Sequence, residues 1–487
     1  MSSALLLGID DGTTAVKAAL FDAELRGVAQ ARRPVPVTHP APDLVEQDPQ
    51  LILDAVIDAV AEVLEHARGR EVLAAGLDHQ GESVLAWEAD SGRPLTPVVV
   101  WQDKRHESLL ARIGARSIGR SGLPLDPYFS AGRMAWLLER DELVRAARDA
   151  GSLRIGTVDA FLTDRLAGRF ATDLSTASRT QLLAVGGRDW DEQLLATFGL
   201  RRELLPRVGP TFGPLAELHC ERWPVAVPLR AQLVDQQAAL VGSGAVRPGQ
   251  LKATYGTGVF VLGRTAGPAV AHGLLPTVAW AAPDEGGDVG EVAYALDGGV
   301  FAAGSLLDWL AQGLGLAPDA AALAAAAASV PDSAGVMVLP ALAGLGAPWW
   351  RPHAHGVIAG LTSAAGMAHL ARAALEAIAW RVADIVEAMA AVVPVQSLRV
   401  DGGLTNDATL LQIQSDALGL PLSVGRPDAT VLGAAMLAGV GAGLFASVED
   451  AARRLPSGRL VTPSAAPRER ARRRELWRAF VDAGARL

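Results

Sequence analysis

The chain has 487 residues, half of them hydrophobic, and a formal net charge of −9. This length exceeds what one hydrophobic core supports, so we expect two large domains or a few smaller ones. The acidic balance, with no Lys/Arg-rich face, argues against a nucleic-acid partner. The single cysteine excludes a disulfide framework and a thiolate metal cluster.

The sequence predicts neither an N-terminal targeting segment nor a membrane span. The N-terminal apolar run is only about five residues long before Asp10, and no basic region precedes it, unlike a signal peptide. The apolar run 320–328 lies between Pro318 and Pro331 and is far shorter than the roughly 20 residues that a membrane helix needs. We therefore expect a soluble, cytoplasmic protein with no membrane partner.

The first elements in chain order indicate α/β alternation. The segment ALLLGIDDGTTAVKAALFD at 4–22 predicts a strand, a polar Gly-Thr turn and a second strand, hence a hairpin. Residues 48–67 carry apolar side chains at helical spacing after an Asp-Pro start, and the strand candidate VLAAGL at 72–77 follows. This alternation is typical of α/β domains.

A second segment repeats the pattern of the first. LKATYGTGVFVLG at 251–263 again reads as strand, Gly-Thr turn and strand, and the Pro- and Gly-containing VRPGQ before it predicts a domain boundary near 245. A strand at 335–342, a helix from Met367 to about Val392, a strand at 397–403 and a helix at 409–419 follow. We expect a duplicated α/β unit, with domains 1–245 and 246–487 and a cleft between them.

The two Gly-Thr turns are candidate phosphate sites. In the first, Gly12, Thr13 and Thr14 offer backbone and hydroxyl donors to a phosphate, and Asp10 at the strand end is suited to the accompanying Mg²⁺. Such a turn alone is more often an ordinary surface hairpin. A second turn, with Thr257, begins the second half, and the pair of them indicates a nucleotide.

Other nucleotide and hydrolase motifs are missing. The sequence has no G-x-x-x-x-G-K-[ST], no G-x-G-x-x-G after a strand and no suitably placed G-x-S-x-G. His353 and His355 lack a nearby carboxylate set and are expected in a surface loop. The basic run near the C-terminus alternates with Glu, Leu and Trp at helical spacing, which favours a solvated helix over RNA binding.

Three further polar positions carry open interpretations. Asp235 follows an apolar strand and is either a general base beside a cleft or a helix cap. Gly402 and Gly403 lie between a strand and a helix, where they either let the backbone approach an adenosine or only make a tight turn. Glu82, in DHQGES after a buried strand, is a costly place for a carboxylate without a partner.

Ten ordered segments between about residues 5 and 445 resemble the FGGY carbohydrate kinases, whose glycerol-phosphorylating members are the most similar. They are GIDDGTT, WQDKR, GLPLDPYFSAGRMAWLLE, GTVDAFLTDRL, ATDLSTASRT, DQQAALVG, ATYGTGVFVL, ALDGGVFAAGSLLDWL, PALAGLGAPWW and VDGGLTNDATLLQIQSD. The resemblance implies two actin-like (ribonuclease-H-like) domains, ATP and Mg²⁺ as cofactors, a small polyol or sugar as substrate, and a homo-oligomer, either dimer or tetramer.

The same resemblance implies roles for individual residues. Asp235 corresponds to the catalytic base that accepts the proton of the substrate hydroxyl, and Asp10 to the Mg²⁺ partner. The implied polyol pocket consists of Glu82, Trp101, Tyr128, Asp235, Gln236 and Phe260. The implied nucleotide contacts are Thr13, Thr14, Lys17, Thr257, Gly304, Gly403 and, on the adenine side, Asp407.

The chain departs from the family's pattern at Gly81, where those enzymes carry an arginine that donates to glycerol. We predict that its absence leaves space the size of a long side chain, so that a four- or five-carbon polyol or a ketose of the xylulose type is phosphorylated as well as glycerol or better. A non-catalytic actin-like ATP-binding module is a remote alternative. The loop that senses fructose bisphosphate in some relatives is not visible at 207–232, so we do not expect that regulation.

Overall fold

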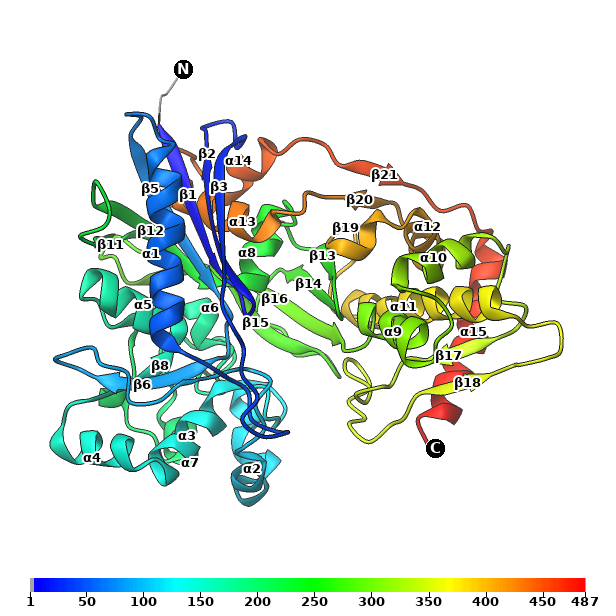
Figure 1. The fold of residues 1–487 in the computed structure, drawn as a ribbon, viewed down its shortest axis with the longest axis horizontal. Coiled ribbons are helices and arrows are strands. Elements are labelled where there is room, and N and C mark those ends of the chain that lie inside the picture. Colours follow the sequence, from blue (N-terminus) through cyan, green and yellow to red (C-terminus); the bar gives the residue numbers. More distant parts are fainter. Residues whose placement is uncertain (1–3, 487) are drawn as a thin grey trace. The chain divides into compact units, whose positions relative to one another are not determined.

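The computed structural model describes residues 4–486, with the side chains of 115–117 left out. It is an α/β protein that divides into two compact units (Figure 1). Unit 1 comprises Met1–Val246, Pro276–Ala295 and Asp428–Leu455, and unit 2 comprises Arg247–Leu275, Leu296–Pro427 and Pro456–Leu487. The sequence predicts two continuous halves, 1–245 and 246–487, and this division misses the two later segments that pack into unit 1.

Unit 1 is built on a six-stranded sheet of order β11-β12-β5-β1-β2-β3. The predicted hairpin is confirmed, because β1 and β2 pair antiparallel, and the predicted strand β5 pairs parallel with β1. The strands are β1 (Leu5–Asp11), β2 (Ala15–Phe21), β3 (Gly27–Pro34), β5 (Val72–His79), β11 (Phe212–Leu218) and β12 (Val227–Val234).

Strand β1 is buried on both faces, and its residues alternate between two helices. Leu5, Leu7 and Ile9 belong to the core on the side of α1 (Pro49–Glu65), the helix that the sequence predicts over 48–67. Gly8 faces α13 (Ala429–Gly441), where an added Cβ would lie 2.1 Å from the Val431 carbonyl oxygen. The all-apolar β1 therefore follows from cover on both faces.

Unit 1 has two smaller sheets and several further helices besides the six-stranded sheet. A four-stranded sheet of order β4-β7-β6-β8 consists of β4 (Glu46–Gln47), β6 (Val84–Glu88), β7 (Val98–Val99) and β8 (Leu153–Thr157). Strands β9 (Ala171–Asp173) and β10 (Arg207–Gly209) form a separate pair. The other helices are α2 (Glu107–Ile113), α3 (Ser130–Arg140), α4 (Glu142–Ala150), α5 (Val158–Ala167), α6 (Leu174–Ala177), α7 (Glu192–Phe198), α8 (Asp235–Gly242) and α14 (Val448–Arg453).

The second large sheet has seven strands in the order β15-β16-β14-β13-β19-β20-β21, and most of them belong to unit 2. The second predicted hairpin is confirmed, since β13 and β14 pair antiparallel and β19 pairs parallel with β13. Its strands in unit 2 are β13 (Gln250–Tyr255), β14 (Val259–Thr265), β19 (Ser397–Asp401), β20 (Leu422–Val424) and β21 (Arg459–Val461). Strand β15 (Leu275–Pro283) and the first part of β16 (Val289–Val300) fall in the segment Pro276–Ala295, which is counted with unit 1. The predicted strand near 337 is β17 (Met337–Leu339), which pairs only with β18 (Val357–Ala359) in a small separate sheet.

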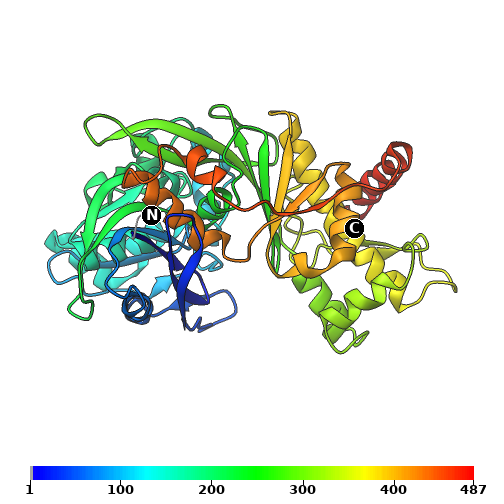
Figure 2. The ribbon, with the colours of Figure 1, turned by 90° about the horizontal axis from the view of Figure 1, so that it is seen from above.

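The helices of unit 2 enclose its hydrophobic core. They are α9 (Gly304–Asp308), α10 (Ala320–Ala328), α11 (Met367–Ala390), α12 (Ala408–Leu418) and α15 (Pro467–Gly484). The basic C-terminal run forms α15, drawn in red in Figure 2, as the sequence predicts. Trp477 of α15 is nevertheless buried, and Arg474 contacts Asp384 of α11 at 2.5 Å. Among the described residues, no helix combines the length and apolarity needed to cross a membrane.

Candidate active site

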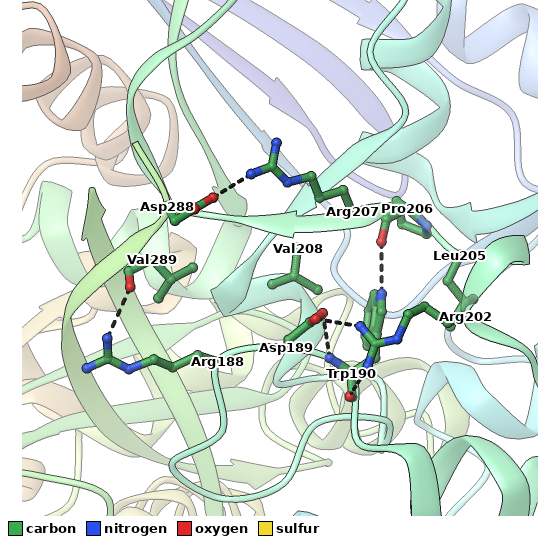
Figure 3. A pocket seen from close by; sticks show the side chains of 10 residues that line it. All are labelled: Arg188, Asp189, Trp190, Arg202, Leu205, Pro206, Arg207, Val208, Asp288 and Val289. Carbon is green, nitrogen blue, oxygen red and sulfur yellow. Dashed lines mark hydrogen bonds and ion pairs between the residues drawn. The ribbon is translucent and has the colours of Figure 1, made fainter. Parts of the chain in front are cut away.

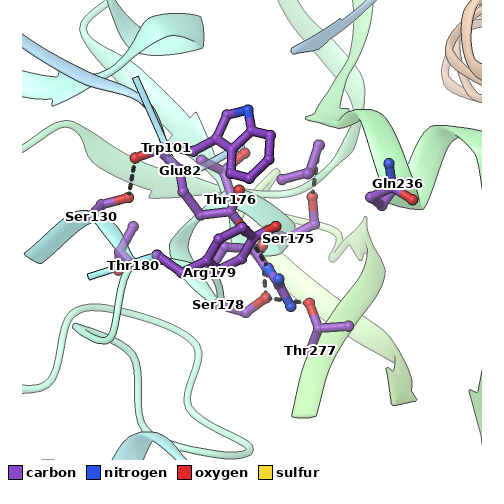
Figure 4. Close-up of polar contacts among 12 residues, drawn as sticks. Glu82, Trp101, Ser130, Ser175, Thr176, Ser178, Arg179, Thr180, Gln236 and Thr277 are labelled. Atoms are coloured by element: carbon purple, nitrogen blue, oxygen red, sulfur yellow. Dashed lines mark hydrogen bonds and ion pairs between the residues drawn. The ribbon is translucent and has the colours of Figure 1, made fainter. Parts of the chain in front are cut away.

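Glu82 lies just past β5, in the tight loop before β6, and it is paired. Its Oε1 accepts a hydrogen bond from Arg179 Nε at 2.8 Å (Figure 4). The side chains of Glu82 and Arg179 are only 6% and 3% exposed. A charged pair removed from water persists where its geometry is good and further contacts support it. No partner for Glu82 could be predicted from the sequence, and the structure shows that the Arg179 guanidinium holds its carboxylate in one orientation.

Aromatic rings adjoin this ion pair. The Arg179 guanidinium carbon lies 5.7 Å from the ring centroids of both Tyr128 and Phe129. The Trp101 and Tyr128 rings meet edge to face, with centroids 5.6 Å apart at 75°. Rings of this kind give an apolar wall, while Tyr128 and Trp101 also carry a polar atom. A charged pair beside an aromatic wall suits a ligand with hydroxyl groups on a short carbon chain.

Arg133 of α3 ties the backbones of these site residues together. Its guanidinium donates to the carbonyl oxygens of Glu82 at 2.9 Å, Pro127 at 2.7 Å and Tyr128 at 3.0 Å, and also to that of Trp101. Burial lowers the pKa of Arg133 to about 10, although nearby carboxylates oppose that shift. One buried side chain thus fixes three segments that are far apart in the sequence.

Asp235 is the first residue of α8, directly after β12, as the strand pattern predicted. Its Oδ1 accepts a hydrogen bond from the backbone N–H of Gln236 at 2.5 Å. Burial and then the charges of Asp10 and Asp235 raise the pKa of Asp78 well above its ordinary value. Asp235 therefore belongs to the same acidic cluster as the end of β1.

The first phosphate hairpin places Thr13 and Thr14 in the turn between β1 and β2. Asp10 and Lys17 lie opposite each other on the two strands, with Lys17 Nζ 3.9 Å from Asp10 Oδ2. Burial raises the pKa of Asp10, while the Lys17 charge lowers it. Burial and the Asp10 charge raise the pKa of Asp11 well above its usual range. These crowded carboxyls would be stabilised by added positive charge.

The residues at this position fit a magnesium ion that is shared with a ligand. Within the described part of the chain, no group of three or more His, Cys, Asp or Glu side chains could hold a metal by itself. Mg²⁺ commonly takes one or two carboxylates and completes its shell with water and substrate phosphates. Asp10 is 8% exposed and supplies the hard oxygen ligand that such a site needs.

Unit 2 carries the other predicted nucleotide residues. Thr257 is exposed in the turn between β13 and β14, and Gly304 N donates to Gly256 O of that turn at 3.1 Å. A Cβ on Gly304 would lie 2.7 Å from the same oxygen, so a glycine is needed where α9 begins. Gly403 has open space above its Cα. Phe260 is half-buried on β14.

Asp407 caps a helix. Its Oδ1 accepts from the backbone N–H groups of Thr409 at 2.8 Å and Leu410 at 3.2 Å, at the start of α12. This is the ordinary N-cap geometry, which satisfies amides at the helix start. The adenine-side role that the resemblance implies for Asp407 stays a prediction.

The space predicted at Gly81 is filled. A Cβ on Gly81 would lie 2.5 Å from Val234 Cγ1 and 3.0 Å from Val234 Cγ2. The isopropyl group of Val234, which precedes Asp235, thus occupies the position that the sequence left empty. The prediction of room for a long side chain or a longer polyol at this point is therefore wrong.

Unit 1 also has a pocket of about 440 Å³ away from these residues (Figure 3). Two of its arginines are paired with carboxylates, Arg202 with Asp189 and Arg207 with Asp288. None of the residues that line it is a predicted site residue. Its lining residues are Arg188, Asp189, Trp190, Arg202, Leu205, Pro206, Arg207, Val208, Asp288 and Val289.

Most of the predicted site residues are found in unit 1. They are Asp10, Thr13, Thr14, Lys17, Glu82, Trp101, Tyr128, Asp235 and Gln236, whereas Thr257, Phe260, Gly304, Gly403 and Asp407 are in unit 2. Sequence reasoning missed Arg179 and Arg133, although both lie inside segments that resemble the kinases. For Arg133 the available signal was an arginine within the apolar run AGRMAWLL, whereas Arg179 lies in the polar run STASRTQ, where an arginine does not stand out.

Comparisons with known proteins identify the family of this chain. The N-terminal domain model of the FGGY family of carbohydrate kinases matches residues 5–242, and the C-terminal domain model matches residues 251–442. A glycerol kinase from Citrifermentans bemidjiense is 41% identical, covering 98% of this chain and 97% of the relative. A glycerol kinase from Thermus brockianus is 43% identical over 90% of each chain.

Solved structures share the fold. The crystal structure of Plasmodium falciparum glycerol kinase with ADP superposes with a TM-score of 0.92 at 27% identity, covering 99% of this chain and 98% of that one. A xylulose kinase from Lactobacillus acidophilus, at 21% identity and a TM-score of 0.87, shows the fold alone. From the two matched domains and these relatives, the chain belongs to the FGGY family of carbohydrate kinases.

Proposed function

We propose that this kinase transfers the γ-phosphoryl group of ATP to a hydroxyl group of glycerol. The observation that carries the proposal is the Glu82–Arg179 pair beside the Trp101 and Tyr128 rings. A carboxylate with its second oxygen available accepts substrate O–H groups, and the rings cover the C–H face. The relatives that are about 40% identical over nearly the whole chain are glycerol kinases, which supports the choice.

Arg179 replaces the missing guanidinium of position 81 in this account. The relatives' arginine would come from the loop before Glu82, whereas Arg179 reaches Glu82 from the segment after α6. Val234 closes the space at Gly81, so the pocket is not enlarged there. The basis for preferring a longer polyol or a ketose is thereby removed, and glycerol is the substrate we propose.

The chemistry requires one proton transfer and one phosphoryl transfer. Asp235 accepts the proton of the substrate hydroxyl, whose oxygen forms the new bond to the γ-phosphorus. The bond between that phosphorus and the bridging oxygen breaks, and ADP leaves. The predicted phosphate contacts are Thr13, Thr14, Lys17, Thr257, Gly304 and Gly403, with Asp407 on the adenine side and Phe260 at the polyol. Asp10 would hold Mg²⁺, which would neutralise charge on the phosphates.

A substrate panel tests the proposal. ADP release is measured with glycerol, erythritol, threitol, dihydroxyacetone and xylulose under identical conditions. We expect the highest kcat/KM for glycerol, because the pocket gains no volume at Gly81. A higher kcat/KM for erythritol, threitol or xylulose would reject glycerol and favour the longer-substrate alternative.

Gly81→Arg sharpens this test. We expect the single variant to disturb the fold, because a Cβ at position 81 would clash with the Val234 side chain. The double variant with Val234→Gly restores the room and is the matched form in which to test the relatives' arginine. We expect it to bind glycerol without favouring longer polyols.

A further inference from the structure

Five residues of unit 1 form a closed ring of hydrogen bonds. Gln47 Nε2 donates to the Thr13 carbonyl oxygen at 2.8 Å, and Gln80 Nε2 donates to Gln47 Oε1 at 2.9 Å. Ser83 Oγ donates to Gln80 Oε1 at 2.9 Å and accepts from the Trp101 backbone N–H at 3.1 Å. Trp101 Nε1 then donates to Thr13 Oγ1 at 3.1 Å and closes the ring.

The ring has few alternatives to its present bonds. Gln47 and Gln80 are each 2% exposed and Ser83 is fully buried, so water does not readily replace a lost partner. Hydrogen bonds joined head to tail in a poorly solvated place strengthen one another. A change at one member is therefore transmitted to its neighbours.

Both predicted binding regions of unit 1 are members of this ring. Thr13 belongs to the first phosphate hairpin, and the indole of Trp101 forms the aromatic wall with Tyr128. The Thr13 hydroxyl accepts the indole N–H, so its own hydrogen points to another acceptor. A phosphate oxygen at the hairpin is such an acceptor. Ser83 directly follows Glu82, which connects the carboxylate loop to the same ring.

We propose that this ring couples polyol binding to nucleotide binding, with Gln47 as a positioning residue. The inference rests on the proposed glycerol kinase function. Glycerol packed against Trp101 holds the indole, the indole holds Thr13, and Gln47 holds the hairpin backbone from the other side. Because coupling between two sites is reciprocal, the nucleotide must raise glycerol affinity by the same factor.

The test measures glycerol binding by calorimetry with and without a non-hydrolysable ATP analogue and Mg²⁺. For the wild type we expect the analogue to tighten glycerol binding by about fivefold or more. Gln47→Met keeps the side-chain length but removes both amide bonds. The coupling ratio is the glycerol Kd without the analogue divided by the Kd with it, and we expect this ratio to fall toward one in the variant. Its glycerol affinity without the nucleotide should change by less than about twofold, because Gln47 is not one of the predicted substrate contacts and its amide bonds to Thr13 and Gln80.

Two further variants separate coupling from folding. Ser83→Ala breaks the ring at another bond by removing only a hydroxyl, and it should lose the coupling as well. Gln50→Met is the control, because Gln50 is an exposed residue of α1 whose Nε2 donates to Asp54 at 3.1 Å on the same helix, and its coupling should match that of the wild type. Thermal unfolding of each variant shows whether the fold is kept.

The outcomes are distinct. A wild-type ratio near one, or a wild-type ratio kept in folded Gln47→Met or in Ser83→Ala, would overturn the coupling while leaving turnover of glycerol untouched. No phosphorylation of glycerol by the wild type would instead reject the proposed function on which the coupling rests.

Discussion

The two Gly-Thr hairpins share a backbone plan but differ in their charges. In unit 1, Asp10 of β1 lies beside Lys17 of β2 and Asp78 of β5. In unit 2, Thr254 of β13 occupies the matching place, beside Phe260 of β14 and Asp401 of β19. A carboxylate in one unit is thus a hydroxyl in the other.

The lysine beside the carboxyl is buried in unit 2, whereas in unit 1 Lys17 pairs with Asp10 at 3.9 Å and is 33% exposed. Lys252 of unit 2 is fully buried, and its Nζ donates to Thr254 Oγ1 at 2.9 Å. Burial raises the pKa of Asp401, but the Lys252 charge and a hydrogen bond with Thr254 lower it. In unit 1 the pKa values of Asp10, Asp11 and Asp78 are all raised, first of all by burial. The pKa of Asp401 is raised as well, so the two hairpins differ in the number of buried carboxyls near the turn and in the burial of the lysine beside them.

The largest effect is expected at Asp235, beside the acidic hairpin. Asp235→Asn removes the proton acceptor and should lower kcat by about 10³-fold at saturating ATP and glycerol. Circular dichroism and thermal unfolding should show an intact fold. A variant that turns over at nearly the wild-type rate would show that Asp235 is not the base.

Arg179 forms a buried ion pair with Glu82 in the unit 1 site. Arg179→Met leaves the Glu82 carboxylate buried without its guanidinium and should lower the free energy of unfolding by about 3–5 kcal/mol. Denaturant unfolding measures this loss. The double variant with Glu82→Gln should recover much of it, and a single variant as stable as the wild type would contradict the assigned pairing.

The two lysines give the most direct contrast between the hairpins. Lys252→Met should lower the free energy of unfolding by about 2–3 kcal/mol, because Asp401 loses its buried counter-charge. Lys17→Met, at a side chain 33% exposed, should cost less than about 1 kcal/mol and raise the KM for ATP instead. Equal losses of stability at both positions would remove the proposed difference between the hairpins.

The last effect concerns acid stability and is absent at neutral pH. Burial, followed by the Arg133 charge, lowers the pKa of His106 to about 3. The unfolded chain binds a proton there near pH 6.5 while the folded protein does not, so stability falls as the pH drops from about 6.5 toward 3. At pH 5 the loss is about 2 kcal/mol. His106→Gln should flatten this part of the stability curve, and an unchanged slope would exclude His106 as its cause.

Local pattern was enough to predict both hairpins and several helices. Leu5, Leu7 and Ile9 follow the period of a strand, and residues 49–65 follow the period of a helix. The sequence placed segment 428–455 in the second domain, whereas the structure packs it into unit 1. Helix α13 in this segment is apolar on every side, a pattern that predicts burial but not the partner. Which helix covers Gly8 is decided by packing between distant segments.

The candidate site shows the same limit. Asp10, Glu82 and Asp235 stand out because carboxylates at the ends of apolar strands are unusual. Arg179 contacts Glu82 from far along the chain, and Val234 fills the space at Gly81 in the same way. A single sequence does not show which distant residues are in contact. The acidic groups could therefore be predicted, but not the pairing of Glu82 with Arg179 or the contact of Val234 with the space at Gly81.

The central claim is that the acidic hairpin of unit 1 serves phosphoryl transfer to a polyol. Phosphorus NMR of the wild type with ATP, Mg²⁺ and glycerol tests it most directly. We expect a phosphate-ester signal whose intensity corresponds to one equivalent of ester for each equivalent of ATP converted to ADP. Release of inorganic phosphate without any ester, or no consumption of ATP, would contradict the account.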